Sequence, residues 1–78
     1  MDLRIGDYIS VNPEACGGDP CFKGARIMVH LVLELLAAGE TAEEILDGYP
    51  SLSKSHIQAA LMYAAKTVEM GKIASLIQ

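Results

Sequence analysis

The sequence predicts a mainly α-helical fold, in which a short N-terminal β ribbon precedes a bundle of three helices. Residues 8–11 are rich in β-branched and aromatic side chains, which favour a strand. Beyond residue 27, three segments have apolar residues at helical spacing, and turns with glycine or proline separate them. The five-residue polar turn YPSLS joins the last two segments, so these two helices are predicted to form a helix-turn-helix.

The length and the composition point to one small domain. A domain of 78 residues buries only about 60% of its unfolded surface. Since 51% of the residues are apolar, a domain of this size cannot bury all of its apolar surface. Part of the apolar surface is therefore expected to contact a partner, and the prediction is a homo-oligomer, in the first place a dimer. We expect a single domain over residues 1–78, with the ribbon and loop at 1–27, the three helices at 28–70 and a tail at 71–78.

The sequence contains no pattern typical of secretion or of a membrane span. The start MDLRIGDYIS lacks the basic end and the apolar stretch of a signal peptide. The longest nearly apolar run, residues 27–38, is too short to span a bilayer. These features predict a cytoplasmic protein without membrane contact, in which Cys16 and Cys21 stay reduced.

The segment NPEACGGDPCFKGARI, residues 12–27, is an unusual start for a helical protein. Gly17 and Gly18 permit positive φ angles, and Pro20 holds the residue before it extended. The stretch ARIMV that follows can begin as a second short strand before the chain turns helical. We expect this loop to fold the chain back, so that the ribbon pairs across a subunit boundary and both cysteines pack inside the turn.

The first helix is predicted from Met28 to Ala38, with Gly39 as its C-terminal stop. It is apolar nearly all round, and His30 and Glu34 are the exceptions. A helix of this composition is expected to be the central and most buried element.

The second and third helices carry recognisable start signals. Thr41 and Glu44 in TAEE have the spacing of a capping box, and Gly48 is expected to end this helix within two turns. Ser53 is the predicted N-cap of the third helix, where Leu52 and Ile57 have the spacing of a hydrophobic staple. The apolar stripe predicted for the third helix consists of Ile57, Ala60, Leu61, Ala64 and Val68.

No metal site, cofactor site or catalytic group is predicted. Cys16 and Cys21 lie five residues apart, and neither His30 nor His56 has ligand spacing to the other. Cys–His catalysis needs a base held against the thiolate, which this spacing does not provide. The sequence GDPCFKGA places Lys23 before the glycine and has no following Ser or Thr, so it does not match a phosphate-binding P-loop.

A few basic and polar residues form a candidate DNA-binding set, although the net charge of −4 counts against nucleic-acid binding. Lys23 and Arg26 follow the loop and can contact phosphate. The third helix starts where a recognition helix presents side chains to bases, with Lys54, Ser55, His56 and Gln58. The alternative is a solvated helix start, and the acidic second helix would repel phosphate.

Three stretches together resemble one known family: NPEACGGDPCFKGARI, LLAAGETAEEIL and YPSLSKSHIQAAL. Over residues 9–65 the chain is similar to the domain of unknown function 433 family. The resemblance implies a homeodomain-like three-helix fold behind a short β segment. It also implies the antitoxin half of a toxin–antitoxin pair, encoded beside a nuclease toxin of the PIN type. The usual GTRI is GARI here, and the start of the third helix, usually acidic in the family, is SKSH.

The leading hypothesis is a dimeric DNA-binding antitoxin-type transcriptional regulator, with the dimer formed by the ribbon and the first helix. The residues expected to contact a toxin are Val68, Ile73, Leu76 and Ile77. The rival hypothesis is a protein-interaction module that neutralises a partner without touching DNA, which the acidic second helix favours. An enzyme is the least supported hypothesis.

Overall fold

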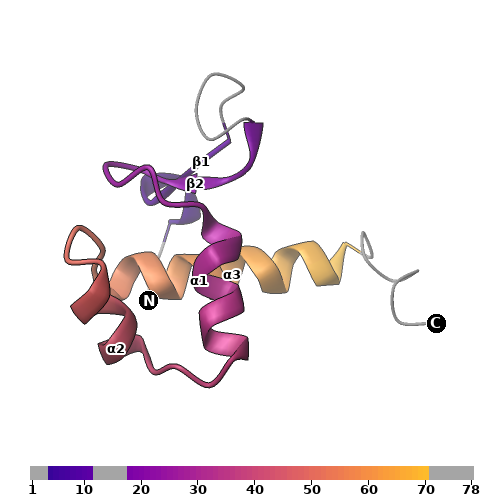
Figure 1. The fold of residues 1–78 in the computed structure, drawn as a ribbon. Coiled ribbons are helices and arrows are strands. Elements are labelled where there is room, and N and C mark those ends of the chain that lie inside the picture. The colour runs from indigo at the N-terminus through magenta and orange to yellow at the C-terminus, as the bar shows by residue number, and fades with distance from the viewer. Residues whose placement is uncertain (1–3, 12–17, 71–78) are drawn as a thin grey trace.

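The computed structural model of the protein describes residues 4–11 and 18–70 (Figure 1). Three helices follow a small two-stranded antiparallel sheet, as the sequence predicts, but the second strand is not in ARIMV as expected: it is Cys21–Phe22, and only Met28 of ARIMV forms a β-bridge. The elements in chain order are the 3-10 helix η1 (Ile5–Asp7), β1 (Ile9–Ser10), β2 (Cys21–Phe22), α1 (Val29–Ala37), α2 (Ala42–Gly48) and α3 (Lys54–Glu69).

The ribbon is paired within the chain. Ile9 lies opposite Phe22 in the antiparallel register of β1 and β2. On its other edge, Cys21 forms a β-bridge with Met28, so the segment before α1 acts as a third short strand. Among the described residues, β2 is therefore occupied on both edges, and pairing across a subunit boundary is left to the outer edge of β1.

The loop that the sequence singled out is described only in part. Gly18 has a φ of 89°, as expected for a turn glycine. Cys21 is buried with 5% of its surface exposed, in agreement with the expected packing of this thiol. Cys16 and Gly17 lie outside the described residues.

α1 ends as predicted, but it is not the most buried element. The amide N–H of Glu40 donates to the Leu35 carbonyl at 3.1 Å across Gly39, whose φ is 98°, which is a Schellman ending. Both residues of β2 are buried, whereas α1 buries two of its nine residues, Val29 and Val32. The expectation was wrong because the leucines of α1 are only half-buried, and one side of the helix faces solvent.

The helix starts follow the sequence signals. The Glu44 amide N–H donates to Thr41 Oγ1 at 3.1 Å, and the Thr41 N–H donates to Glu44 Oε1 at 2.8 Å, which completes the predicted capping box of α2. Ser53 is the N-cap of α3, and Leu52 and Ile57 are both buried in the core, as a hydrophobic staple requires.

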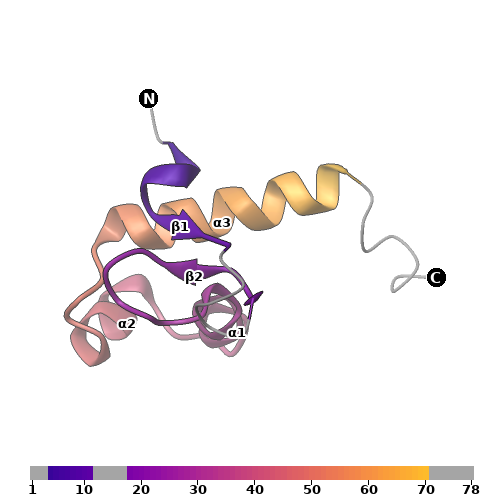
Figure 2. The ribbon, with the colours of Figure 1, turned by 90° about the horizontal axis from the view of Figure 1, so that it is seen from above.

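The predicted apolar stripe of α3 is partly wrong. Ile57 and Ala60 are buried, but Leu61 and Val68 are 51% and 53% exposed, and Ala59 is buried in their place. The reason is visible in both ribbon views: the second half of α3 extends past α1, where no other described element covers it (Figures 1 and 2).

The core lies where α3 meets the ribbon, α1 and α2. Figure 2 shows η1 and β1 along the first half of α3, and α1 and α2 on its other side. The largest fully buried side chains come from three elements, β2, α1 and α2: Phe22, Val29, Val32 and Ile45. This packing fixes the start of α3 and leaves its end projecting.

Val32 is completely buried, so the Val32→Ala variant should lose about 2–3 kcal/mol of unfolding free energy through lost burial and a residual cavity. The matched Val11→Ala variant removes the same two methyl groups from a side chain that is 59% exposed and should change stability by less than about 0.5 kcal/mol. Urea unfolding followed by circular dichroism measures both, and equal losses would contradict this core.

Candidate functional site

The outward side of α3 is one continuous stripe. Its members follow each other at alternating spacings of four and three residues, which places them on one face of a helix with 3.6 residues per turn. All of them are exposed: Lys54, Gln58, Leu61, Ala65 and Val68. The first half of the stripe is polar and the second half is apolar, so α3 presents two chemically different surfaces on one side.

Three of the four residues predicted at the start of α3 are accessible to a ligand. Lys54 and Gln58 are exposed on the stripe, and Ser55 is half-buried at its flank. A helix start that is open in this way can present side chains to a groove. His56, the fourth residue, is half-buried as well, but its ring packs against Tyr8 and Phe22.

The imidazole of His56 completes the cap of α3. Its Nδ1 accepts a hydrogen bond from the Ser53 backbone N–H at 3.0 Å and lies 2.9 Å from Ser53 Oγ. Nδ1 can accept only when it carries no proton, so the ring hydrogen is on Nε2. Histidine takes the position that glutamate holds in the usual capping box, and the signal S-x-x-H in SKSH could have shown this role.

The same ring joins α3 to the ribbon. Its centroid lies 5.1 Å from that of Tyr8 and 5.7 Å from that of Phe22, with interplanar angles of 75° and 78°. Both are edge-to-face contacts, the favoured arrangement of aromatic rings. His56 therefore positions the start of α3 against β2 and against Tyr8, the residue before β1.

Two cationic side chains project from the turn between β2 and α1. Lys23 and Arg26 are both exposed, and Lys23 Nζ donates a hydrogen bond to the Gly6 carbonyl of η1. Arg26 has a φ of 52°, a left-handed conformation that costs free energy in any residue with a Cβ. The turn lies at the same end of the molecule as the start of α3 in both views (Figures 1 and 2).

The acidic side chains of α2 lie at this end as well. Glu43, Glu44 and Asp47 are exposed on α2, next to the connection to α3 (Figure 1). Glu44 is engaged in the capping box of α2. A polyanion can therefore reach the start of α3 from the side of the ribbon, but it is repelled on the side of α2.

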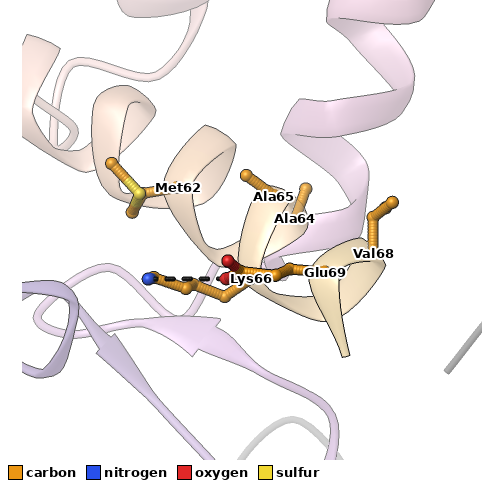
Figure 3. Close-up of a pocket in the computed structure, with 6 residues that line it drawn as sticks. All are labelled: Met62, Ala64, Ala65, Lys66, Val68 and Glu69. Carbon is orange, nitrogen blue, oxygen red and sulfur yellow. Dashed lines mark ion pairs between the residues drawn. The ribbon is translucent and has the colours of Figure 1, made fainter. Parts of the chain in front are cut away.

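The second half of α3 carries a shallow apolar surface, shown in Figure 3. Lys66 and Glu69 flank it and form an ion pair with an N–O distance of 3.6 Å. Val68, predicted to contact a toxin, is exposed here, whereas Ile73, Leu76 and Ile77 lie outside the described residues. The residues that line the surface are Met62, Ala64, Ala65, Lys66, Val68 and Glu69.

Within residues 4–11 and 18–70, no three His, Cys, Asp or Glu side chains cluster as metal ligands would. His30 Nδ1 instead lies 3.4 Å from Glu34 Oε1 on the exposed side of α1. In the same two ranges, no helix is long and apolar enough to cross a membrane.

Comparison with known proteins assigns the chain to a family. The model of the family described as "Protein of unknown function (DUF433)" matches residues 9–64. The chain belongs to the DUF433 family. The match begins at β1 and ends within α3, so the DUF433 segment includes the ribbon, the turn with Lys23 and Arg26, and most of the α3 stripe.

A curated relative supports this assignment. The uncharacterized protein y4eO of Sinorhizobium fredii (strain NBRC 101917 / NGR234) is 34% identical over 58 residues. These residues are 74% of this chain and 26% of that protein, so the chain corresponds to about a quarter of its relative. No solved structure matches the chain.

The His56→Ala variant should lose about 2 kcal/mol of unfolding free energy, because it removes both the cap acceptor and two edge-to-face contacts. His56→Gln can still accept from the Ser53 N–H and should lose about half as much. Ser55→Ala, at the neighbouring position, should stay within about 0.5 kcal/mol of the wild type. Chemical unfolding of the three variants tests this, and a silent His56→Ala would contradict the positioning role.

Proposed function

We propose that this DUF433 chain is a DNA-binding transcriptional regulator of the antitoxin type, in which the start of α3 contacts the major groove. The observation that carries the proposal is the open polar half of the α3 stripe. Lys54 and Gln58 are exposed there, and Ser55 lies beside them. Lysine and glutamine side chains recognise guanine and adenine edges respectively.

The turn before α1 supplies the phosphate contacts in this proposal. Lys23 and Arg26 are exposed, and the turn that carries them lies at the same end of the molecule as the start of α3 (Figure 2). The hydrogen bond of Lys23 Nζ to Gly6 leaves two N–H donors of the ammonium group for phosphate oxygens. The cost of a left-handed Arg26 is consistent with a position held for function.

His56 supports this function without contacting DNA. Its ring holds the N-cap of α3 against Tyr8 and β2, so the helix start and the basic turn keep one relative position. Preorganised groups lose less entropy on binding, which raises affinity.

The antitoxin role follows from the family resemblance, and we propose a PIN-type nuclease toxin as the protein partner, in the cytoplasm. Val68 of α3 and Ile73, Leu76 and Ile77 beyond it are the proposed toxin contacts. The exposure of Val68 at the projecting end of α3 supports this assignment. We also propose that the chain self-associates, since several apolar side chains of α3 are exposed.

The second candidate function is neutralisation of a partner protein without DNA binding. The acidic face of α2 with Glu43, Glu44 and Asp47 favours it, because these carboxylates stand next to the start of α3. The two functions differ in their dependence on Lys54, which only DNA binding requires.

Binding to duplex DNA from the protein's own promoter should weaken steeply with salt, as about two to four phosphate contacts per chain imply. Lys54→Ala should weaken binding, and Lys23→Ala, which removes a phosphate contact, should lower the magnitude of the slope of log K against log salt by about one. Lys66→Ala removes the same charge at the other end of α3 and is the control, expected to keep the slope. Fluorescence anisotropy at several salt concentrations measures this; no binding of the wild type at low salt would favour the second function.

Arg26→Gly separates folding from binding. Glycine relieves the left-handed strain, about 1–2 kcal/mol, but it adds backbone entropy to the unfolded chain, which costs a similar amount or less. The free energy of unfolding should therefore stay equal or rise by about 1 kcal/mol. DNA affinity should nevertheless fall, because a phosphate contact is lost. Unfolding and anisotropy on the same sample test this, and unchanged affinity would remove Arg26 from the interface.

A further inference from the structure

Exposed apolar side chains gather on the second half of α3. Six large hydrophobic residues are exposed in the described part of the chain, and four of them lie between residues 61 and 70. These four are Leu61, Met62, Val68 and Met70. A concentration of this kind on a small protein marks a contact surface.

The surfaces that the sequence suggested for a dimer offer less. The exposed side of α1 carries His30 and Glu34, which interact with each other at 3.4 Å. β2 is occupied on both edges, and Val11 and Met28 are the large apolar side chains exposed near the ribbon. α3 is therefore the better candidate for self-association.

The stripe on α3 has the geometry of a helix-pairing seam. Gln58, Leu61, Ala65 and Val68 follow the alternating three- and four-residue spacing of the a and d positions in coiled coils. Ala65 in the middle is small, which lets a second helix approach closely. In an antiparallel pair, Ala65 packs on Leu61 of the second copy, and Val68 packs on Gln58 of the second copy.

Charge selects the orientation of the two helices. A parallel pair would place Lys54 against Lys54 and Glu69 against Glu69, which is repulsive. In the antiparallel register, Lys54 of one copy lies within one helical turn, about 4.5 Å along the axis, of Glu69 of the other. Both side chains are exposed, and Glu69 would exchange its ion pair with Lys66 of its own chain for one with Lys54 of the other copy.

We propose that a second copy of this chain occupies the α3 stripe in an antiparallel pair, and that this pair excludes DNA. The seam and the proposed DNA-reading residues share one side of one helix. The pair covers Gln58 and neutralises Lys54, so the dimer and the DNA complex compete. This inference assigns Val68 to the contact between copies. The exclusion of DNA rests on the proposed function, whereas the pairing itself does not.

Sedimentation of the full chain without DNA tests the pairing. The wild type should form dimers as its concentration rises to several hundred micromolar, since one short helix pair makes a small and weak interface. Ala65→Glu, which puts a charge into the seam, should raise the dissociation constant about tenfold or more. Ala37→Glu, the same substitution at an exposed position of α1, is the matched control and should leave dimerisation unchanged.

A charge exchange tests the orientation. Lys54→Glu and Glu69→Lys should each weaken the dimer, and the double variant should recover it, because only the antiparallel pair brings these two positions together. A wild type that stays monomeric, or an Ala65→Glu variant as dimeric as the wild type, would overturn the proposal. Circular dichroism checks that Ala65→Glu keeps its helix, and Val68→Lys is the second variant if it does not.

DNA provides the readout for competition. Promoter DNA should shift the wild type from dimer to monomer, and Ala65→Glu should bind DNA with no loss of affinity at high protein concentration. A ternary complex of intact dimer and DNA would overturn the exclusion. If neither protein binds DNA while the dimer and its variants behave as expected, the proposed function fails and the pairing stands.

Discussion

The imidazole of His56 connects two parts of this small protein that are far apart in sequence, the start of α3 and the ribbon. One ring nitrogen caps α3 through the Ser53 N–H, and the ring makes edge-to-face contacts with Tyr8 and Phe22. Without this ring, the helix start and the ribbon would be joined only by apolar packing, which is not directional. The relative position of the basic turn and the polar start of α3 depends on this contact.

A second feature that determines the surface of the protein is that the other elements cover only the first half of α3. α1, α2, η1 and the ribbon surround its first half, while the second half projects (Figures 1 and 2). Ile57, Ala59 and Ala60 face the core, so the residues on the other side form a stripe that is open over its whole length. In the proposed antiparallel pair, the second copy covers part of both the polar and the apolar half of this stripe.

Local charge has more influence on partners here than the net charge of −4. Screening at physiological salt limits exposed charges to a range of about 8 Å, so a phosphate group near the turn responds chiefly to Lys23 and Arg26. The carboxylates of α2 repel a phosphate group over the same short range on their side of the molecule. The positive charges of the turn and the negative charges of α2 together restrict the direction from which a polyanion can approach. Such a restriction favours one binding geometry.

The sequence alone determined the local features of this fold: the helix starts at Thr41 and Ser53, the stop at Gly39, the short ribbon and the family. These depend on neighbouring residues and on backbone preferences, which periodicity and capping patterns report. Only the tertiary structure decided that the His56 ring packs against the ribbon, that Leu61 and Val68 stay exposed, and that the leucines of α1 are only half-buried. The physical reason is that a helix with apolar residues on several sides has more than one face that could be buried. Which face is buried depends on where the other elements cross the helix, and here α1 crosses α3 steeply and leaves its second half uncovered (Figures 1 and 2).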